Sequence, residues 1–250
     1  MPLLFRAFVV LHILCGSVGL VSFWLPVVSR KGGRTHRNWG NVFTGAMLAT
    51  GSAAVGISLC TLVDPLGCHP HLAGRTDPRL GTFDAALIRG IFGWMMLYLA
   101  VLTVNLAWYA RQCVLNQRQH ARNRAAFNLS LQAALLVLAV NCAWQGAALQ
   151  QPLLCGMSLI GFATVATNVA FIAARAPGRH RWLQEHIKGG IGAGISVYTA
   201  FFAFGAVRLV PALALNAYLW AIPLAVGLTL IVYHQQRVRR QQTASPATGP

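Results

Sequence analysis

Long apolar runs separated by short basic clusters constrain the fold of this chain more than any other feature. A helix that crosses the hydrocarbon core of a bilayer needs roughly 20 mostly apolar residues. Seven runs meet this length, and they cover residues 7–28, 39–63, 85–109, 126–148, 151–174, 187–208 and 212–233. The sequence therefore predicts an all-α fold, a polytopic helical bundle with about seven transmembrane helices.

The charge balance excludes a soluble, nucleic-acid-binding domain. Hydrophobic residues make up 56% of the chain and charged residues 10%, with 20 Lys and Arg against 4 Asp and Glu. A soluble surface needs about a quarter of its residues charged, and a nucleic-acid site gathers its basic residues on one face. Here they lie in clusters between apolar runs. We expect the lipid bilayer as the main partner, with other membrane subunits or a second copy of the chain as further candidates.

The basic clusters also predict an orientation. Most Arg and Lys residues fall in alternate connections and in the C-terminal segment, and the positive-inside rule places such connections in the cytoplasm. The N-terminus is then outside and the C-terminus inside, in a bacterial inner membrane. We expect residues 1–234 to form one transmembrane domain. Residues 235–250 end in QQTASPATGP and are expected to form a disordered cytoplasmic tail.

Ionisable residues gather at the cytoplasmic ends of the second and sixth spans. This candidate polar cluster contains His36, Arg37, Glu185, His186 and Lys188. Two interpretations remain open: an ion pair between Glu185 and Arg37 or Lys31, or a metal or haem iron held by His36 and His186. Because both histidines are placed near helix ends, a helix-borne pair at one depth is not expected.

His12 is the candidate polar site of the outer leaflet. Gly16 and Gly19 follow it on one helical stripe, and small residues let a neighbouring backbone approach, so the ring is expected to face protein. His12 is too far from the cytoplasmic histidines to share an iron with them. Gly190 and Ala193 repeat the pattern after His186, and these four small residues are predicted helix contacts. Leucine at Gly16 or Gly190 should therefore be more damaging than leucine at Gly227.

Other polar residues give weaker signals. The loop at 64–84 holds Cys68-His69-Pro70-His71, whose spacing matches no closed zinc pattern, and no metal site is assigned. Interhelical hydrogen bonds are a sufficient explanation for most amides inside the spans. These amides are Asn41, Asn105, Asn141, Gln145, Asn168 and Asn216.

Three stretches carry a resemblance to a known family. They read His12-Ile13-x-x-Gly16, Lys31-Gly32-Gly33-x-x-His36-Arg37-x-x-Gly40-x-x-Phe43 and Trp182-Leu183-x-x-His186-Ile187-x-x-x-Ile191-Gly192-Ala193-x-Ile195-x-x-x-Thr199-Ala200-Phe201. The chain resembles a family of uncharacterised bacterial inner-membrane proteins of about seven helices. The resemblance implies no established activity, but it groups His12, His36, Arg37 and His186 as the residues to test.

Three functional hypotheses follow. The first is a membrane protein without enzymatic activity of its own, acting as a small-molecule or lipid-binding, transport or assembly component. The second is a redox protein that binds b-type haem or a metal through His36 and His186, with haem b as its cofactor. The third is a membrane enzyme that acts on lipid headgroups, with Glu185 and His186 as acid and base.

Overall fold

The computed structural model describes residues 2–77, 81–205 and 217–243. The long helices are α1 (Pro2–Val28), α2 (Arg34–Val63), α5 (Met96–Leu115), α6 (Ala126–Ala148), α7 (Pro152–Ala173), α8 (Arg181–Ala200) and α9 (Ala217–Thr243). The short elements are α3 (Pro65–Cys68), α4 (Ala85–Ile88) and η2 (His120–Arg124), two π-helical stretches, η1 (Arg89–Met95) and η3 (Phe201–Gly205), and a hairpin of β1 (Thr76–Asp77) and β2 (Gly81–Thr82).

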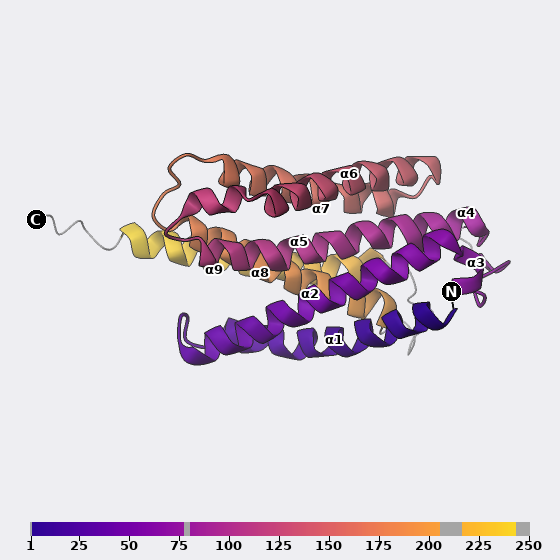
Figure 1. Ribbon diagram of the computed structural model, residues 1–250, viewed down its shortest axis with the longest axis horizontal. Coiled ribbons are helices and arrows are strands. Elements are labelled where there is room, and N and C mark those ends of the chain that lie inside the picture. Colours follow the sequence, from indigo (N-terminus) through magenta and orange to yellow (C-terminus); the bar gives the residue numbers. More distant parts are fainter. Residues whose placement is uncertain (1, 78–80, 206–216, 244–250) are drawn as a thin grey trace, which may run out of the picture.

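The long helices lie side by side along the long axis of the molecule (Figure 1). Helix α1 packs on α2, α6 on α7 and α9 on α8, while α5 contacts α2, α8 and α6. The connections 29–33, 116–125 and 174–180 meet at one end, at the left of Figure 1, which we call the basic end. The connections 64–84 and 149–151 meet at the other, which we call the hairpin end.

Helix α5 is the centre of the bundle. Over an apolar segment of 18 residues in each span, 56% of the residues are buried in the stretch formed by α4, η1 and α5, against 22% in α1. Close helix contacts need small residues: a Cβ on Gly51 of α2 would lie 3.2 Å from the carbonyl oxygen of Ala100 on α5. The core positions of this stretch include Met95 of η1 and Tyr98 and Leu102 of α5, each 4% exposed or less.

Six helices of the described residues are long and apolar enough to cross a membrane. They match the first six predicted spans, so the chain is an all-α bundle with the character of a polytopic membrane protein. Residues 206–216, which contain the end of the sixth predicted span and the start of the seventh, lie outside the described residues.

The predicted ends of several elements are wrong. Helix α2 begins at Arg34 rather than at 39, and α8 begins at Arg181 rather than at 187. Charged residues can stay helical beyond the hydrocarbon core because their long side chains reach water and headgroups. For the same reason α9 continues to Thr243, so a disordered tail from residue 235 is wrong for residues 235–243.

Candidate functional site

His36 and His186 meet at the basic end of the bundle. Their ring centroids lie 6.5 Å apart, with the ring planes at 76°. His36 is on the first turn of α2 and His186 on the second turn of α8, so the two imidazoles come from different helices at one depth. The expectation that no such pair exists is wrong, because both helices begin earlier than the apolar pattern indicates.

His36 is oriented by the end of α1. Its Nδ1 lies 3.0 Å from the carbonyl oxygen of Pro26, which also accepts a hydrogen bond of 2.9 Å from the Lys31 ammonium. The last carbonyls of a helix have no partner within it, and these two side chains supply partners. The turn between the helices requires Gly32, whose φ of 76° lies in the left-handed region that favours glycine.

His186 is oriented by α5. Its Nδ1 lies 3.0 Å from the carbonyl oxygen of Ala110, and the neighbouring Glu185 accepts a hydrogen bond of 2.9 Å from the Tyr109 hydroxyl. Two consecutive residues of α8 thus bond two consecutive residues of α5. Gly189 allows this close approach, because a Cβ there would lie 3.0 Å from both the Leu106 carbonyl oxygen and the Ala110 Cβ.

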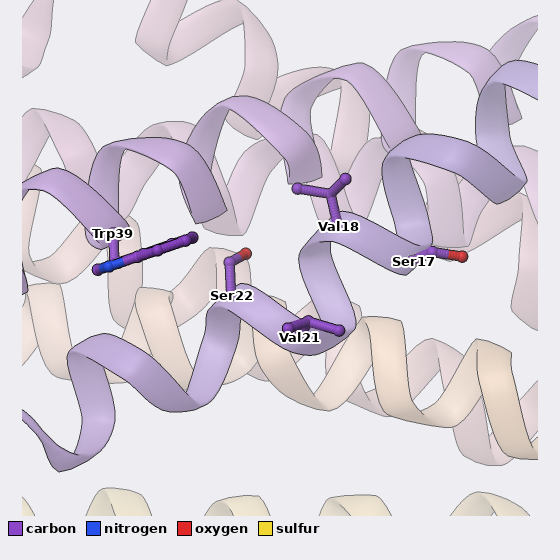
Figure 2. Close-up of a pocket in the computed structure, with 5 residues that line it drawn as sticks. All are labelled: Ser17, Val18, Val21, Ser22 and Trp39. Carbon is purple, nitrogen blue, oxygen red and sulfur yellow. The ribbon is translucent and has the colours of Figure 1, made fainter.

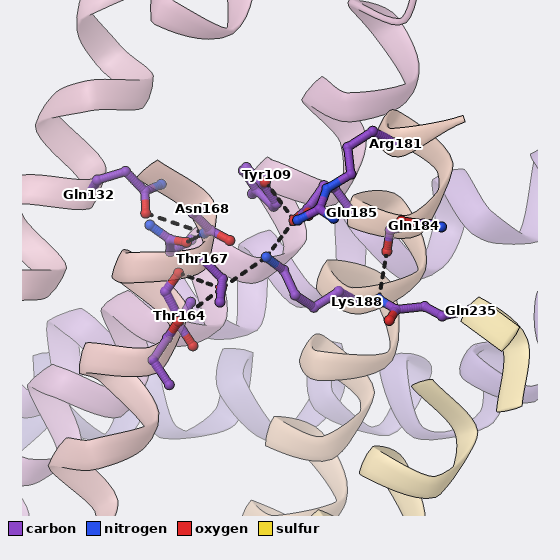
Figure 3. A network of polar contacts seen from close by, with 12 residues as sticks. Tyr109, Gln132, Thr164, Thr167, Asn168, Arg181, Gln184, Glu185, Lys188 and Gln235 are labelled. Atoms are coloured by element: carbon purple, nitrogen blue, oxygen red, sulfur yellow. Dashed lines mark hydrogen bonds and ion pairs between the residues drawn. The ribbon is translucent and has the colours of Figure 1, made fainter. Parts of the chain in front are cut away.

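Glu185 is buried and fully partnered (Figure 3). Arg181 pairs with one carboxylate oxygen at 3.1 Å, and Lys188 pairs with the other. Lys188 also donates to the Thr167 hydroxyl on α7 at 3.0 Å. The predicted pairing of Glu185 with Arg37 or Lys31 is therefore wrong: its cationic partners lie four residues before and three after it on α8.

The hydrogen bonds decide which ring nitrogen of His36 and His186 is free. A carbonyl oxygen only accepts, so each Nδ1 carries the proton and each Nε2 keeps its lone pair. Within the described part of the chain, neither Nε2 has a hydrogen-bond partner. An imidazole held through Nδ1–H by a carbonyl is the usual arrangement of a metal-binding histidine. Arg37 follows His36 on α2 and is exposed.

The remaining predicted contact residues divide into two groups. His12 Nδ1 lies 3.1 Å from the Thr50 carbonyl oxygen of α2, so its ring faces protein. Gly16 and Gly19 are buried on the same face, and Ala193 is fully buried. Gly190 is different: no atom lies within 4 Å of a Cβ placed there. The predicted contact at Gly190 is wrong, and the adjacent Gly189 makes it instead.

Figure 2 shows a groove between α1 and α2. Trp39, which lines it, follows His36 by three residues on α2. The volume of the groove is about 330 Å³, and Ser17, Val18, Val21 and Ser22 of α1 line it with Trp39 of α2. This lining is almost entirely apolar.

The loop histidines form part of an aromatic cap at the hairpin end. His69 Nε2 lies 3.1 Å from the Thr61 hydroxyl, and its ring packs against Phe5 and Phe92 at 5.3 and 5.0 Å between centroids. Burial and the neighbouring His71 lower the pKa of His69 from 6.5 to about 4. In the described residues, His, Cys, Asp and Glu side chains form no group of three that could hold a metal ion.

Acidification should open this cap. An exposed histidine takes up a proton near its ordinary pKa of 6.5, whereas the packed His69 stays neutral until about pH 4. The packed form is therefore fully stable above about pH 6.5 and loses stability as the pH falls towards 4. We expect hydrogen exchange of residues 64–77 to be severalfold faster at pH 4.5 than at pH 7, after correction for intrinsic rates. His69→Gln should remove the difference, and equal protection of the wild type at both pH values would contradict the assignment.

Sequence reasoning missed two contributors to the buried polar contacts. Tyr109, the hydroxyl partner of Glu185, is 1% exposed, and Gln132, which bonds Asn168 at 3.2 Å, is 2% exposed. Tyr109 follows Asn105 by four residues, so both lie on one face of α5. This spacing is the sequence feature from which a buried polar role of Tyr109 could have been predicted.

Comparisons with protein-family models, curated proteins and solved structures give no match to this chain.

Proposed function

We propose that the chain is a membrane-integral b-type haem protein that transfers electrons, with His36 and His186 as the residues that would hold the haem iron. One observation carries this proposal: two imidazoles from different helices, each with its Nδ1–H on a backbone carbonyl, have ring centroids 6.5 Å apart. The proposed ligands are side chains of helices α2 and α8, which both pack on α5.

The spacing fits one iron between the rings. A bond from a metal to an imidazole nitrogen is about 2.0 Å long, so two imidazoles on opposite sides of one iron have centroids roughly 6 Å apart. Haem takes only two ligands from the protein, because the porphyrin supplies four nitrogens. When bound, haem supplies one-electron redox chemistry.

The charges around the pair fit an anionic cofactor. Burial and the nearby Arg237 guanidinium lower the pKa of Lys31, so a negative group would be stabilised between these cations. Haem b carries two propionates. The one acid at this end, Glu185, is already paired with Arg181 and Lys188. Lys31 and Arg237 are the proposed propionate partners.

Location and orientation remain part of the proposal. The excess of Arg and Lys at the basic end supports a cytoplasmic position for that end, with the N-terminus outside, in a bacterial inner membrane. The motifs around His12, His36 and His186 support membership of the uncharacterised family that the chain resembles. If haem does not bind, the alternative is a small-molecule or lipid-binding, transport or assembly component.

Titration with haemin tests the proposal. Detergent-purified protein should bind one haemin per chain, with a sharp break in the Soret absorbance at a ratio of one and the spectrum of six-coordinate low-spin iron. Binding without a break, or a spectrum equal to that of haemin in empty detergent micelles, would overturn the proposal.

A further inference from the structure

Unpaired polar atoms are concentrated along one line between α5, α6 and α7. Nine buried side-chain nitrogen or oxygen atoms in the described residues lack a hydrogen-bond partner. Six of them follow this line from the basic end: His120 Nε2, Asn128 Oδ1, Trp108 Nε1, Gln132 Nε2, Asn105 Nδ2 and Asn168 Oδ1. Buried polar groups in folded proteins are almost always paired with protein or with ordered water, so such a concentration needs a common explanation.

The innermost group is a triad of amides, one from each helix. Asn168 Nδ2 of α7 donates to Asn105 Oδ1 of α5 at 3.1 Å and to Gln132 Oε1 of α6 at 3.2 Å. All three residues are 2% exposed or less. Their two contacts leave two NH₂ groups and one carbonyl oxygen unfilled. Exchanging the nitrogen and oxygen positions of any one amide still leaves groups without a partner, because two hydrogen bonds cannot satisfy three NH₂ groups and three carbonyl oxygens.

A second layer lies about one helical turn nearer the basic end. Trp108 follows Asn105 by three residues on α5, and Asn128 precedes Gln132 by four on α6. The ring contact of Trp108 with Phe127, at 5.1 Å between centroids, shows that these parts of α5 and α6 face each other. This layer has an unfilled donor, the indole N–H, and an unfilled acceptor, Asn128 Oδ1.

The second layer is joined to the basic end by a network of amides. Asn128 Nδ2 donates to the Asn123 carbonyl oxygen at 2.6 Å, and Asn123 Oδ1 accepts from Asn116 Nδ2 at 2.9 Å. Asn123 also lies 3.2 Å from His120 Nδ1. Asn116 and Asn123 belong to the connection between α5 and α6, so polar groups continue from that connection into the bundle.

We infer that a file of ordered water molecules enters the bundle from the basic end and ends at the amide triad. The unfilled groups match the chemistry of water, which accepts two hydrogen bonds and donates two. One water satisfies the triad by accepting from Asn105 and Gln132 and donating to Asn168. A second joins Trp108 to Asn128. Asn128 and Gln132 are four residues apart on α6, so the two layers lie about 6 Å apart at 1.5 Å per residue. The file continues from Asn128 to Asn123 in the connection at the basic end.

The file gives water and protons a route into the half of the bundle made by α5, α6 and α7. It does not depend on the histidine pair, because none of its members contacts His36 or His186 in the described hydrogen bonds.

Radiolytic hydroxyl labelling, read by mass spectrometry, tests the water file, because hydroxyl radicals formed from bound water oxidise the side chains beside it. Trp108 is the probe. Trp94 of η1 is the matched control. It is a half-buried tryptophan of the helical stretch that continues into α5, and it is not one of the residues with an unpaired buried atom. Trp108 should be oxidised at least about fivefold faster than Trp94. Equal or slower oxidation of Trp108 in the wild type would overturn the inference.

A variant gives a second, independent readout. Asn128→Leu removes the acceptor opposite Trp108 and should reduce the labelling of Trp108 to that of Trp94. Unchanged labelling of Trp108 in folded Asn128→Leu protein would overturn the placement of water at this layer. The wild-type comparison remains decisive if this variant does not fold.

Discussion

Purified His186→Ala protein is expected to lose haem binding at least about 100-fold, since changes that only disturb the orientation of a metal ligand already cost 10- to 100-fold. His36→Ala is expected to lose it to a similar extent, because each variant removes one of the two imidazoles that would hold the iron. The remaining haem should be five-coordinate. Haem per chain, measured after purification with haemin supplied, and the Soret position give both results.

His12→Ala is the matched control for these variants. His12 also holds a backbone carbonyl through Nδ1, at 3.1 Å from Thr50, so its replacement costs a similar hydrogen bond of about 1 kcal/mol. It lies on α1, away from the pair at the basic end. Full haem content in His12→Ala, with loss in the other two variants, would assign the site. Equal loss in all three would instead show a general effect on folding.

Gly189→Leu is expected to prevent the native packing of α8 on α5. A Cβ at this position already lies 3.0 Å from the Leu106 carbonyl oxygen, and a backbone atom cannot move aside as a flexible side chain can. Overpacking of this kind typically costs about 1–3 kcal/mol and sometimes more. Separation of the helices also removes the carbonyl that orients His186. We expect a large loss of monodisperse protein in size-exclusion chromatography and little bound haem in what remains.

Gly190→Leu controls for the change of residue type. This neighbour has open space at its Cβ, and leucine favours a helix over glycine by roughly 0.5–1 kcal/mol. We expect yield and melting temperature equal to or above those of the wild type. Similar damage from both substitutions would mean that the assigned face of α8 is wrong.

The spans could be predicted from sequence because a bilayer sets a minimum apolar length, and all six described spans overlap the predicted runs. The helix ends could not, because Arg34 and Arg181 remain helical outside the apolar run. This error also hid the partners of Glu185. Once α8 begins at Arg181, the spacings to Arg181 and Lys188 are those of ordinary intrahelical pairs.

Glycine faces were only partly predictable. The stripe from His12 through Gly16 and Gly19 does face α2, because one face of α1 has its small residues in regular spacing. On α8 the spacing after His186 predicts a contact at Gly190. The contact is made by Gly189, which lies one residue and about 100° around the helix from Gly190. Leucine at Gly227 was expected to be less damaging than leucine at Gly16 or Gly190, yet a Cβ at Gly227 would overlap the Ile195 side chain of α8. Whether a glycine contacts a neighbouring helix depends on where that helix packs, and the spacing of small residues along one helix does not contain this information.

The absorption spectrum of the wild-type protein, expressed with haem supplied and recorded before and after dithionite, tests the central claim most directly. The account predicts a Soret band that shifts and sharpens on reduction, with resolved α and β bands typical of iron held by two imidazoles. A flat visible spectrum, unchanged by dithionite, would contradict the assignment of His36 and His186 as haem ligands.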